Sequence, residues 1–361
     1  MQKTIYLQQP IIPDYRLDLF LLLRKDLGSN FEVFAGENDF GGTPLSCNEA
    51  WNYFQYSKNY YLFGGCFLWQ IGCFRKLLSA DLTILNSNMR ILSNNLILLL
   101  RKLLGRRTIL WGHAAGQSAL GSCFRSMYLR LCDGFISYTE TQKKMLRQNY
   151  SWLKVWNASN ALMPATKCVP VEAEFSEIDS ILYVGRLIEP KKVNLLLESF
   201  IYARTQCLLP DTVKLFFIGD GKMRIDLETL ARKTDFSNSI HFIGHISDVD
   251  KLRSYYRKAI CSVSPGYVGL SAIQSFSFGI PMLVADNELH SPEIEACKKK
   301  FNSKFFSSNN FMALAEELSA FYKERAIWLK NRSVISEWIR NHYSLEAMRD
   351  AFVQAIEETT A

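Results

Sequence analysis

The sequence lacks the patterns that mark metal-binding and disulfide-rich proteins. Its nine cysteines are scattered, with no Cys-x-x-Cys pair and no histidine at a zinc-binding spacing. An odd number of cysteines, most of them inside apolar runs, indicates free thiols in a reducing cytoplasm. We therefore expect no metal site, no redox site and no bound cofactor.

Long apolar runs are also missing. The first ten residues, MQKTIYLQQP, lack the apolar core of a signal peptide and predict a strand. The uncharged run of residues 60–74 has 15 residues and three glycines, so it is too short and too broken to span a bilayer. No Gly-x-Gly-x-x-Gly opens a helix after a first strand, which argues against a nicotinamide-dependent dehydrogenase. We expect a cytoplasmic protein without a transmembrane helix.

What the sequence does contain is typical of a globular protein with two domains. Its 361 residues, 48% hydrophobic and 21% charged, exceed what one hydrophobic core usually holds. Residues 1–165 have 18 Lys and Arg against 10 Asp and Glu, a net charge of +8, whereas the remainder carries −1. A positive N-terminal half fits an anionic membrane or an acidic substrate, and a solvated basic face equally well.

Short apolar runs that alternate with helical patterns predict the fold class. Between residues 180 and 296, five such runs each precede a glycine-bearing turn and then a helical pattern. This order is typical of β-α-β units with buried parallel strands. Residues 4–162 alternate in the same way, although residues 37–60, polar with glycines and aromatics, predict a loop. Residues 164–177, rich in proline and charge, predict the linker.

We therefore predict two α/β domains, residues 1–165 and residues 166–340, each with a Rossmann-like sheet. A final segment, residues 341–361, adds a helix that we expect to pack back on the N-terminal domain. Its apolar residues Leu345, Met348, Phe352 and Ile356 fall at helical spacing, so one face of this helix needs a partner.

Residues suited to binding phosphate follow the predicted strands of the second domain. Parallel sheets bind ligands beyond the carboxyl ends of their strands. Two cations and a glycine-led helix N-terminus form a place to hold a phosphate. The residues concerned are Arg186 and Lys191 after the first run, Gly219, Asp220 and Gly221 after the second, and Gly269, Leu270 and Ser271 after the fourth.

These residues stand within a longer pattern. Residues 181–295 resemble the nucleotide-sugar-binding domain of family-4 glycosyltransferases, through the segments YVGRLIEPKKVNLLLESF, FFIGDG, IHFIGH, AICSVSPGYVGLSAIQSFSFGIPMLVAD and HSPEIEA. In the first half, PDYRLDLFLLL, ILWGHAAG and DGFISYTETQKKML resemble bacterial surface-polysaccharide members. The resemblance implies the GT-B fold, in which two Rossmann-like domains face each other across a cleft.

The resemblance also implies roles for the matching residues. In the family, the cations at Arg186 and Lys191 hold the donor diphosphate and stabilise the charge of the leaving group. His113 corresponds to a histidine near the reacting sugar, suited to proton transfer, with a merely structural strand-end histidine as the alternative. Donor contacts are implied for Gly185, Lys192, Gly219, Gly244, His245, Tyr267, Gly269, Leu270, Ser271, Gln274 and Glu293.

The sequence departs from the family at three positions. Most members carry two glutamates eight positions apart around Gly269, where this chain has Gly266 and Gln274. Gln274 keeps the capacity to hydrogen-bond a ribose, whereas Gly266 supplies no carboxylate. Lys192 replaces a glycine that is usual in the family, so either Lys191 or Lys192 can serve the phosphate. His290 and Glu293 match a segment beside the donor sugar, and equally an ordinary helix start.

Residues 96–107, LILLLRKLLGRR, mix leucines with basic residues. They predict either a core helix with a charged edge or a surface helix at an anionic membrane. The second interpretation would suit an acceptor carried on a lipid.

Together these features predict a metal-independent hexosyltransferase that retains configuration. It would move a sugar from a nucleotide-diphosphate sugar to a polyprenyl-linked saccharide of a bacterial surface polysaccharide, capsule or O-antigen, at the inner face of the cytoplasmic membrane. We expect no nucleic-acid partner. Two alternatives stay open: a nucleotide-sugar epimerase, for which paired acids are not found, and a non-catalytic sugar-nucleotide-binding protein, which the missing carboxylate makes conceivable.

Overall fold

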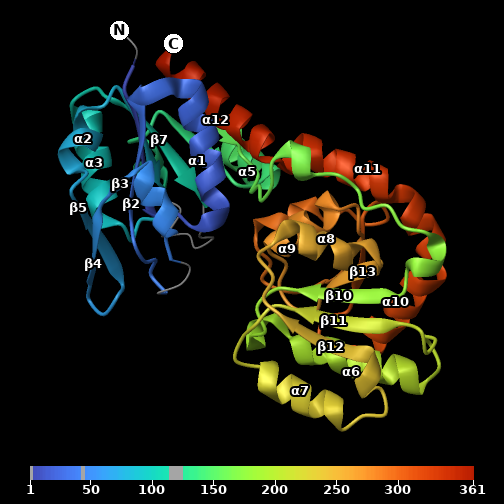
Figure 1. The fold of residues 1–361 in the computed structure, drawn as a ribbon. Coiled ribbons are helices and arrows are strands. Elements are labelled where there is room, and N and C mark those ends of the chain that lie inside the picture. The colour runs from blue at the N-terminus through green and yellow to red at the C-terminus, as the bar shows by residue number, and fades with distance from the viewer. Residues whose placement is uncertain (1–2, 42–44, 114–124) are drawn as a thin grey trace. The chain divides into compact units, whose positions relative to one another are not determined.

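The structure is a computed structural model that describes residues 3–41, 45–113 and 125–361 (Figure 1). The chain divides into an N-terminal unit, Met1–Asn160 with Leu345–Ala361, and a C-terminal unit, Ala161–Ser344. These boundaries differ by four or five residues from those predicted. The predicted linker is packed: Cys168 and Val171 are buried in the core of the C-terminal unit, and the Val171 N–H donates to the carbonyl of Phe278 at 3.0 Å.

The N-terminal unit is built on a parallel sheet that, in the described residues, has seven strands in the order β3-β2-β1-β6-β7-β8-β9. Its central strands are buried on both faces because helices cover them. The strands are β1 (Ile5–Ile11), β2 (Phe31–Gly36), β3 (Gln55–Tyr56), β6 (Leu82–Asn86), β7 (Arg107–Gly112), β8 (Gly134–Ser137) and β9 (Lys154–Asn157). The helices include α1 (Asp14–Leu27), α2 (Phe74–Ser79), α3 (Leu92–Leu103), α5 (Glu140–Asn149) and α12 (Leu345–Thr360).

An antiparallel hairpin, β4 (Lys58–Leu62) and β5 (Phe67–Ile71), extends from this unit (Figure 1). The prediction of a loop over residues 37–60 is therefore wrong at its end, and a 3₁₀ helix (Asn48–Asn52) and β3 also interrupt it. Aromatic and apolar residues pair across the hairpin, Tyr60 with Trp69 and Tyr61 with Leu68, and such pairs stabilise a two-stranded sheet. Gly64 and Gly65, both with positive φ, form its turn.

The C-terminal unit has a second parallel sheet, six-stranded in the order β12-β11-β10-β13-β14-β15 over the residues described. The five apolar runs of the sequence form the strands β10 to β14. The short edge strand β15, which contains Lys304, was not predicted. The strands are β10 (Ser180–Val184), β11 (Lys214–Ile218), β12 (Ile240–Gly244), β13 (Ala259–Ser264), β14 (Met282–Ala285) and β15 (Ser303–Phe306). The helices are α6 (Val193–Thr205), α7 (Arg224–Arg232), α8 (Val249–Arg257), α9 (Leu270–Ser277), α10 (Phe311–Lys323) and α11 (Arg325–Tyr343).

Helix α3, formed by the leucine-rich basic segment, has a buried basic residue and exposed leucines. Arg101 is fully buried, and its guanidinium donates to the carbonyls of Leu77 at 2.7 Å and Ala80 at 2.9 Å. Burial lowers the pKa of Arg101 to about 10. Leu99 and Leu103 face outward, with 44% and 75% of their surface exposed. A basic residue therefore anchors this helix while leucines cover its outer face. In the described part of the chain, no helix combines the length and apolarity that crossing a bilayer requires.

Helix α12 completes the core of the N-terminal unit. Leu345, Met348, Phe352 and Ile356, the face that needed a partner, are all buried. The Phe352 ring lies edge-to-face on Trp111 of β7, with 4.8 Å between centroids. The chain thus returns from the C-terminal unit to supply an essential part of the first core.

We expect Phe352→Ala to lower the free energy of unfolding of the N-terminal unit by about 3–5 kcal/mol, because the change leaves a cavity beside Trp111. Hydrogen exchange of the amides of β1 and β7 measures this local stability. Glu357→Ala, an exposed position on the same helix, should change it by less than about 0.5 kcal/mol. Equal effects of the two substitutions would show that α12 does not complete this core.

Candidate functional site

The first candidate site lies at the carboxyl end of β10 in the C-terminal unit. Gly185, with a φ of +153°, turns the chain out of the strand. The Tyr183 hydroxyl donates to the carbonyl of Arg186 at 2.7 Å, which ties the turn back to the strand. A 3₁₀ helix, Glu189–Lys191, follows and leads into α6. This turn carries both cations that the sequence singled out.

Lys191 is the centre of this site. Its Nζ donates to the main-chain carbonyl of Tyr267 at 2.8 Å and lies 3.5 Å from the centroid of the Tyr267 ring. The Arg186 Nη2 donates to the Tyr267 hydroxyl at 3.3 Å. A Cβ built on Gly269 would lie 3.6 Å from Lys191 Nζ. The structure thus brings Arg186, Lys191, Tyr267 and Gly269 together.

The charge on Lys191 is poorly compensated. Burial and then the neighbouring Arg186 guanidinium lower the pKa of Lys191 to about 8, whereas the Glu293 carboxylate acts in the opposite direction. Because the ammonium lies beside a second cation, binding of an anion stabilises the site. This combination of a shifted pKa and a neighbouring like charge is frequent at functional sites.

The start of α9 adds main-chain donors beside the ammonium. Gly269 is the N-cap residue and provides no side-chain cap. The first N–H groups of a helix, here those of Leu270 and Ser271, have no carbonyl partner within the helix. Together with the positive end of the helix dipole they favour an anion. The arrangement can hold a phosphate or diphosphate.

Lys192 is held elsewhere. Its Nζ bonds the Glu288 carboxylate and, at 2.7 Å, the Asn309 side-chain oxygen. Its backbone takes a left-handed φ of +51°, which explains why glycine would suit this position. Of the two lysines that the sequence left open, Lys191 is the one beside Gly269.

Gly266 has no room for a side chain. A Cβ there would lie 2.4 Å from the carbonyl oxygen of Pro190 and 2.9 Å from the Cα of Lys191. The backbone that positions Lys191 therefore fills the space at the first glutamate position. Gln274, at the second position, accepts a long hydrogen bond from the Tyr256 hydroxyl at 3.5 Å.

Gly185, Gly219 and Gly244 stand at the carboxyl ends of β10, β11 and β12 and lie close together. The Gly219 N–H donates to the carbonyl of Gly244 at 2.8 Å, and a Cβ on Gly219 would lie 1.9 Å from the carbonyl oxygen of Gly185. The close approach of these strand ends requires glycine whether or not a ligand binds. His245 follows and is exposed, and Asp220 pairs with Arg224 at 3.3 Å.

His290 and Glu293 lie next to the start of α9. The Val268 N–H donates to His290 Nδ1 at 3.0 Å, so the neutral ring carries its proton on Nε2. Burial lowers the pKa of His290, and the charge of Lys191 adds to this effect. Glu293, in the 3₁₀ helix Pro292–Ala296, is buried.

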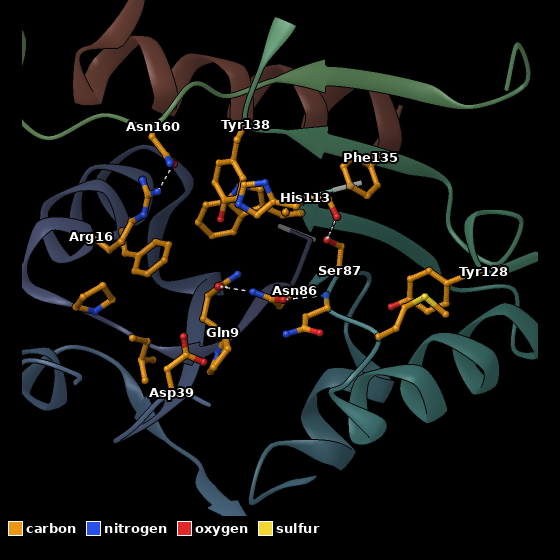
Figure 2. A pocket seen from close by; sticks show the side chains of 18 of the residues that line it. Gln9, Arg16, Asp39, Asn86, Ser87, His113, Tyr128, Phe135, Tyr138 and Asn160 are labelled. Atoms are coloured by element: carbon orange, nitrogen blue, oxygen red, sulfur yellow. Dashed lines mark hydrogen bonds between the residues drawn. The ribbon is translucent and has the colours of Figure 1, made fainter. Parts of the chain in front are cut away.

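The second candidate site is a pocket of about 650 Å³ within the N-terminal unit (Figure 2). His113, which follows β7, lines it, and its ring lies 4.8 Å from that of Tyr138. The Ser87 hydroxyl donates to the His113 carbonyl at 3.3 Å. Residues 114–118, the small AAGQS segment next to His113, lie outside the described residues. The pocket has the size of a small-molecule site.

Of the residues that line this pocket, only His113 was among the predicted site residues. Gln9 ends the predicted first strand, and Asn86 and Asn88 lie where the strand β6 ends, so the carboxyl-end rule could have found them. Arg16 and Asn160 gave no such signal. They come from α1 and from the end of the N-terminal unit, and only the fold brings them together.

The cysteines form no site in the described residues. The eight described cysteines form no disulfide with one another, and Cys123 lies outside the described residues. The described side chains also contain no group of three or more His, Cys, Asp or Glu that could hold a metal ion.

Known proteins resemble this chain in sequence. Residues 170–342 match the family described as glycosyl transferases group 1. An uncharacterized glycosyltransferase of Haemophilus influenzae is 24% identical over 237 residues, 63% of each chain. The O-antigen biosynthesis glycosyltransferase WbnH of Escherichia coli is 25% identical over 167 residues, 45% of each chain. The chain thus spans less than two thirds of the length of these relatives.

Solved structures resemble it over nearly its whole length. HepE of Anabaena, in complex with UDP, superimposes with a TM-score of 0.72 at 12% identity, covering 99% of this chain and 100% of HepE. The lipopolysaccharide outer core galactosyltransferase WaaB gives 0.70 at 16% identity, covering 98% and 99%. The architecture of two Rossmann-like units is that of these GT-B proteins. Residues 170–342 therefore form a glycosyl transferases group 1 domain, and the chain that carries it has the GT-B fold.

Proposed function

We propose that this protein is a glycosyltransferase that moves a sugar from a nucleotide-diphosphate sugar to a saccharide acceptor. The observation that carries the proposal is the position of Lys191, whose ammonium contacts Tyr267 beside the start of α9, while the Arg186 guanidinium donates to the hydroxyl of the same tyrosine. This site lies inside the group 1 domain. HepE, of similar fold, binds UDP.

The geometry suggests how the donor bond would break. As the bond between the sugar and the diphosphate lengthens, negative charge grows on the leaving phosphate oxygens. An ammonium, a guanidinium and main-chain N–H groups held in place beforehand stabilise this charge without reorganisation. We propose that Arg186, Lys191 and the N–H groups of Leu270 and Ser271 serve this role, so that the reaction needs neither a metal ion nor a further cofactor.

The carboxylate that most family-4 members carry near the donor sugar is absent, because residue 266 is a glycine, and the backbone of Pro190 and Lys191 fills the space beside it. Retention of configuration, a family-4 mechanism and transfer of a hexose remain part of the proposal.

The pocket of the N-terminal unit is the proposed acceptor site. It has room for a sugar, and His113 in its lining is suited to accept a proton from an acceptor hydroxyl. WbnH is named for O-antigen biosynthesis and WaaB for the lipopolysaccharide outer core. These names support a saccharide of a bacterial surface polysaccharide as the acceptor, carried on a polyprenyl lipid in our proposal.

The outer face of α3 supports a place at the membrane. Leu99 and Leu103 are exposed beside Lys102, also exposed, and Phe63 at the turn of the neighbouring hairpin is largely exposed. Leucines that enter the headgroup region and cations that meet anionic lipids bind a protein peripherally. We propose that the protein works at the inner face of the cytoplasmic membrane.

The double substitution Arg186→Ala with Lys191→Ala tests the proposed function. Removing two charge-assisted contacts should weaken binding of the best ligand among UDP, GDP, ADP and CDP at least about tenfold, and abolish most transfer. Isothermal titration calorimetry measures the affinity. Lys251→Ala, an exposed lysine of α8, should change neither. Unchanged affinity and transfer in the double variant would end the assignment.

The pH dependence of nucleotide binding gives a second test. With a pKa of about 8, Lys191 loses its proton as the pH rises from about 7 to about 9, and the diphosphate prefers the charged form. The dissociation constant should therefore rise with pH, approaching tenfold per unit above the pKa. Lys191→Arg stays charged and should give a flat profile. The same slope in both proteins would assign the titration to another group.

Membrane association is tested with vesicles that contain phosphatidylglycerol. Leu99→Ser with Leu103→Ser should weaken co-sedimentation by about tenfold or more, because two leucines no longer enter the bilayer. Ile225→Ser, a 76% exposed position on α7 of the C-terminal unit, should leave binding unchanged. Binding that is unchanged by the leucine substitutions, or no binding to the vesicles at all, would contradict the proposed membrane surface on α3.

A further inference from the structure

The pocket of the N-terminal unit contains a buried cation that no described carboxylate neutralises. Arg16 is 7% exposed and lines the pocket. Its Nη2 bonds the side-chain oxygen of Asn160 and its Nη1 lies 3.0 Å from the sulfur of Met348. The guanidinium also lies 5.5 Å from the ring of Trp111. All these partners are neutral, and among the described residues no ion pair to Arg16 is present.

A buried guanidinium surrounded by neutral partners is costly, and buried charges are normally paired. The other charges of the lining do not supply the missing anion. Arg125 adds a second cation. Asp39 is the one acid among the described lining residues, and its Oδ1 accepts the N–H of Phe40 at 2.9 Å without reaching Arg16. Asp14, in the first turn of α1, offsets the positive end of this helix, and its Oδ1 accepts the N–H of Tyr15 at 2.7 Å without an ion pair to Arg16.

Gln9 presents an unpaired donor to the same pocket. The Asn88 N–H donates to Asn86 Oδ1 at 2.9 Å, which fixes the orientation of the Asn86 amide. Asn86 Nδ2 then donates to Gln9 Oε1 at 2.9 Å, which fixes Gln9 in turn (Figure 2). Gln9 is 7% exposed, and its Nε2 is left without an acceptor in the described chain. Such a group requires an explanation, and a ligand oxygen supplies one.

We infer that this pocket selects an acceptor with an anionic group, a phosphate or a carboxylate, that pairs with Arg16, while Gln9 binds an oxygen of the same ligand. Arg16 and Asn160 lie on one wall of the pocket, and Gln9 and Asn86 on another (Figure 2). The name acceptor rests on the proposed function, whereas anion binding at Arg16 does not. Two sources fit this chemistry: the phosphate of a carrier or sugar phosphate, and the carboxylate of an acidic sugar.

Three small probes distinguish these sources: glucose 1-phosphate, methyl glucuronide and the uncharged methyl glucoside. Affinities are measured by calorimetry on the full chain with Arg186→Ala and Lys191→Ala, so that the site in the C-terminal unit contributes no anion binding. At least one charged probe should bind about tenfold more tightly than the glucoside, as a charge-assisted hydrogen bond predicts. The tighter of the two identifies the source.

Arg16→Gln should remove this preference. Arg24→Gln is the matched control, because Arg24 lies on the same helix, stacks on Phe54 and does not line the pocket. Gln9→Glu keeps the oxygen that accepts from Asn86 and adds a negative charge. It should therefore weaken binding of the charged probes and leave binding of the glucoside unchanged. This variant provides the test even if Arg16→Gln does not fold. The inference is overturned if the glucoside binds as tightly as both anions, if no probe binds, or if the preference for an anion is unchanged in the variants. If sugar transfer by the chain with Arg186 and Lys191 intact persists in these cases, the proposed function still stands.

Discussion

The contact of the Lys191 ammonium with Tyr267 and the start of α9 is the interaction on which this account depends. It exists because two glycines leave space. Gly266 lets the backbone of Pro190 and Lys191 approach, and Gly269 leaves the first turn of α9 open to Nζ. In this structure, a side chain at residue 266 would clash with the turn that carries the cation. The close packing of that turn on Gly266 therefore helps to place the ammonium.

Each unit builds its site in the same way, with polar residues at the carboxyl ends of parallel strands. In the C-terminal unit these residues are cations and main-chain donors suited to a diphosphate. In the N-terminal unit they are carboxamides and a histidine, joined by Arg16 of α1, and together they suit a ligand with many oxygens. Helix α12 supports the second site directly, since Met348 contacts Arg16 and Phe352 packs on Trp111.

Much of the fold could be predicted because apolar runs buried on both faces leave a strong signal. Helix α1 and the strands β10 to β14 follow from periodicity alone. The hairpin β4–β5 could not, since its stability comes from pairs such as Tyr60 with Trp69 that a linear reading does not reveal. The sequence pointed to Lys191 and Gly269, but only the fold could separate Lys191 from Lys192, because the partners of Lys192, Glu288 and Asn309, lie far along the chain. Arg16 and Asn160 likewise meet only after folding.

A crystal structure with a bound nucleoside diphosphate tests the central claim most directly. The account predicts phosphate oxygens within hydrogen-bonding distance of Lys191 Nζ and of the main-chain N–H groups of Leu270 and Ser271, with Arg186 turned toward the same diphosphate. A nucleotide bound elsewhere, with Lys191 still donating to the carbonyl of Tyr267 and no phosphate at the start of α9, would contradict it.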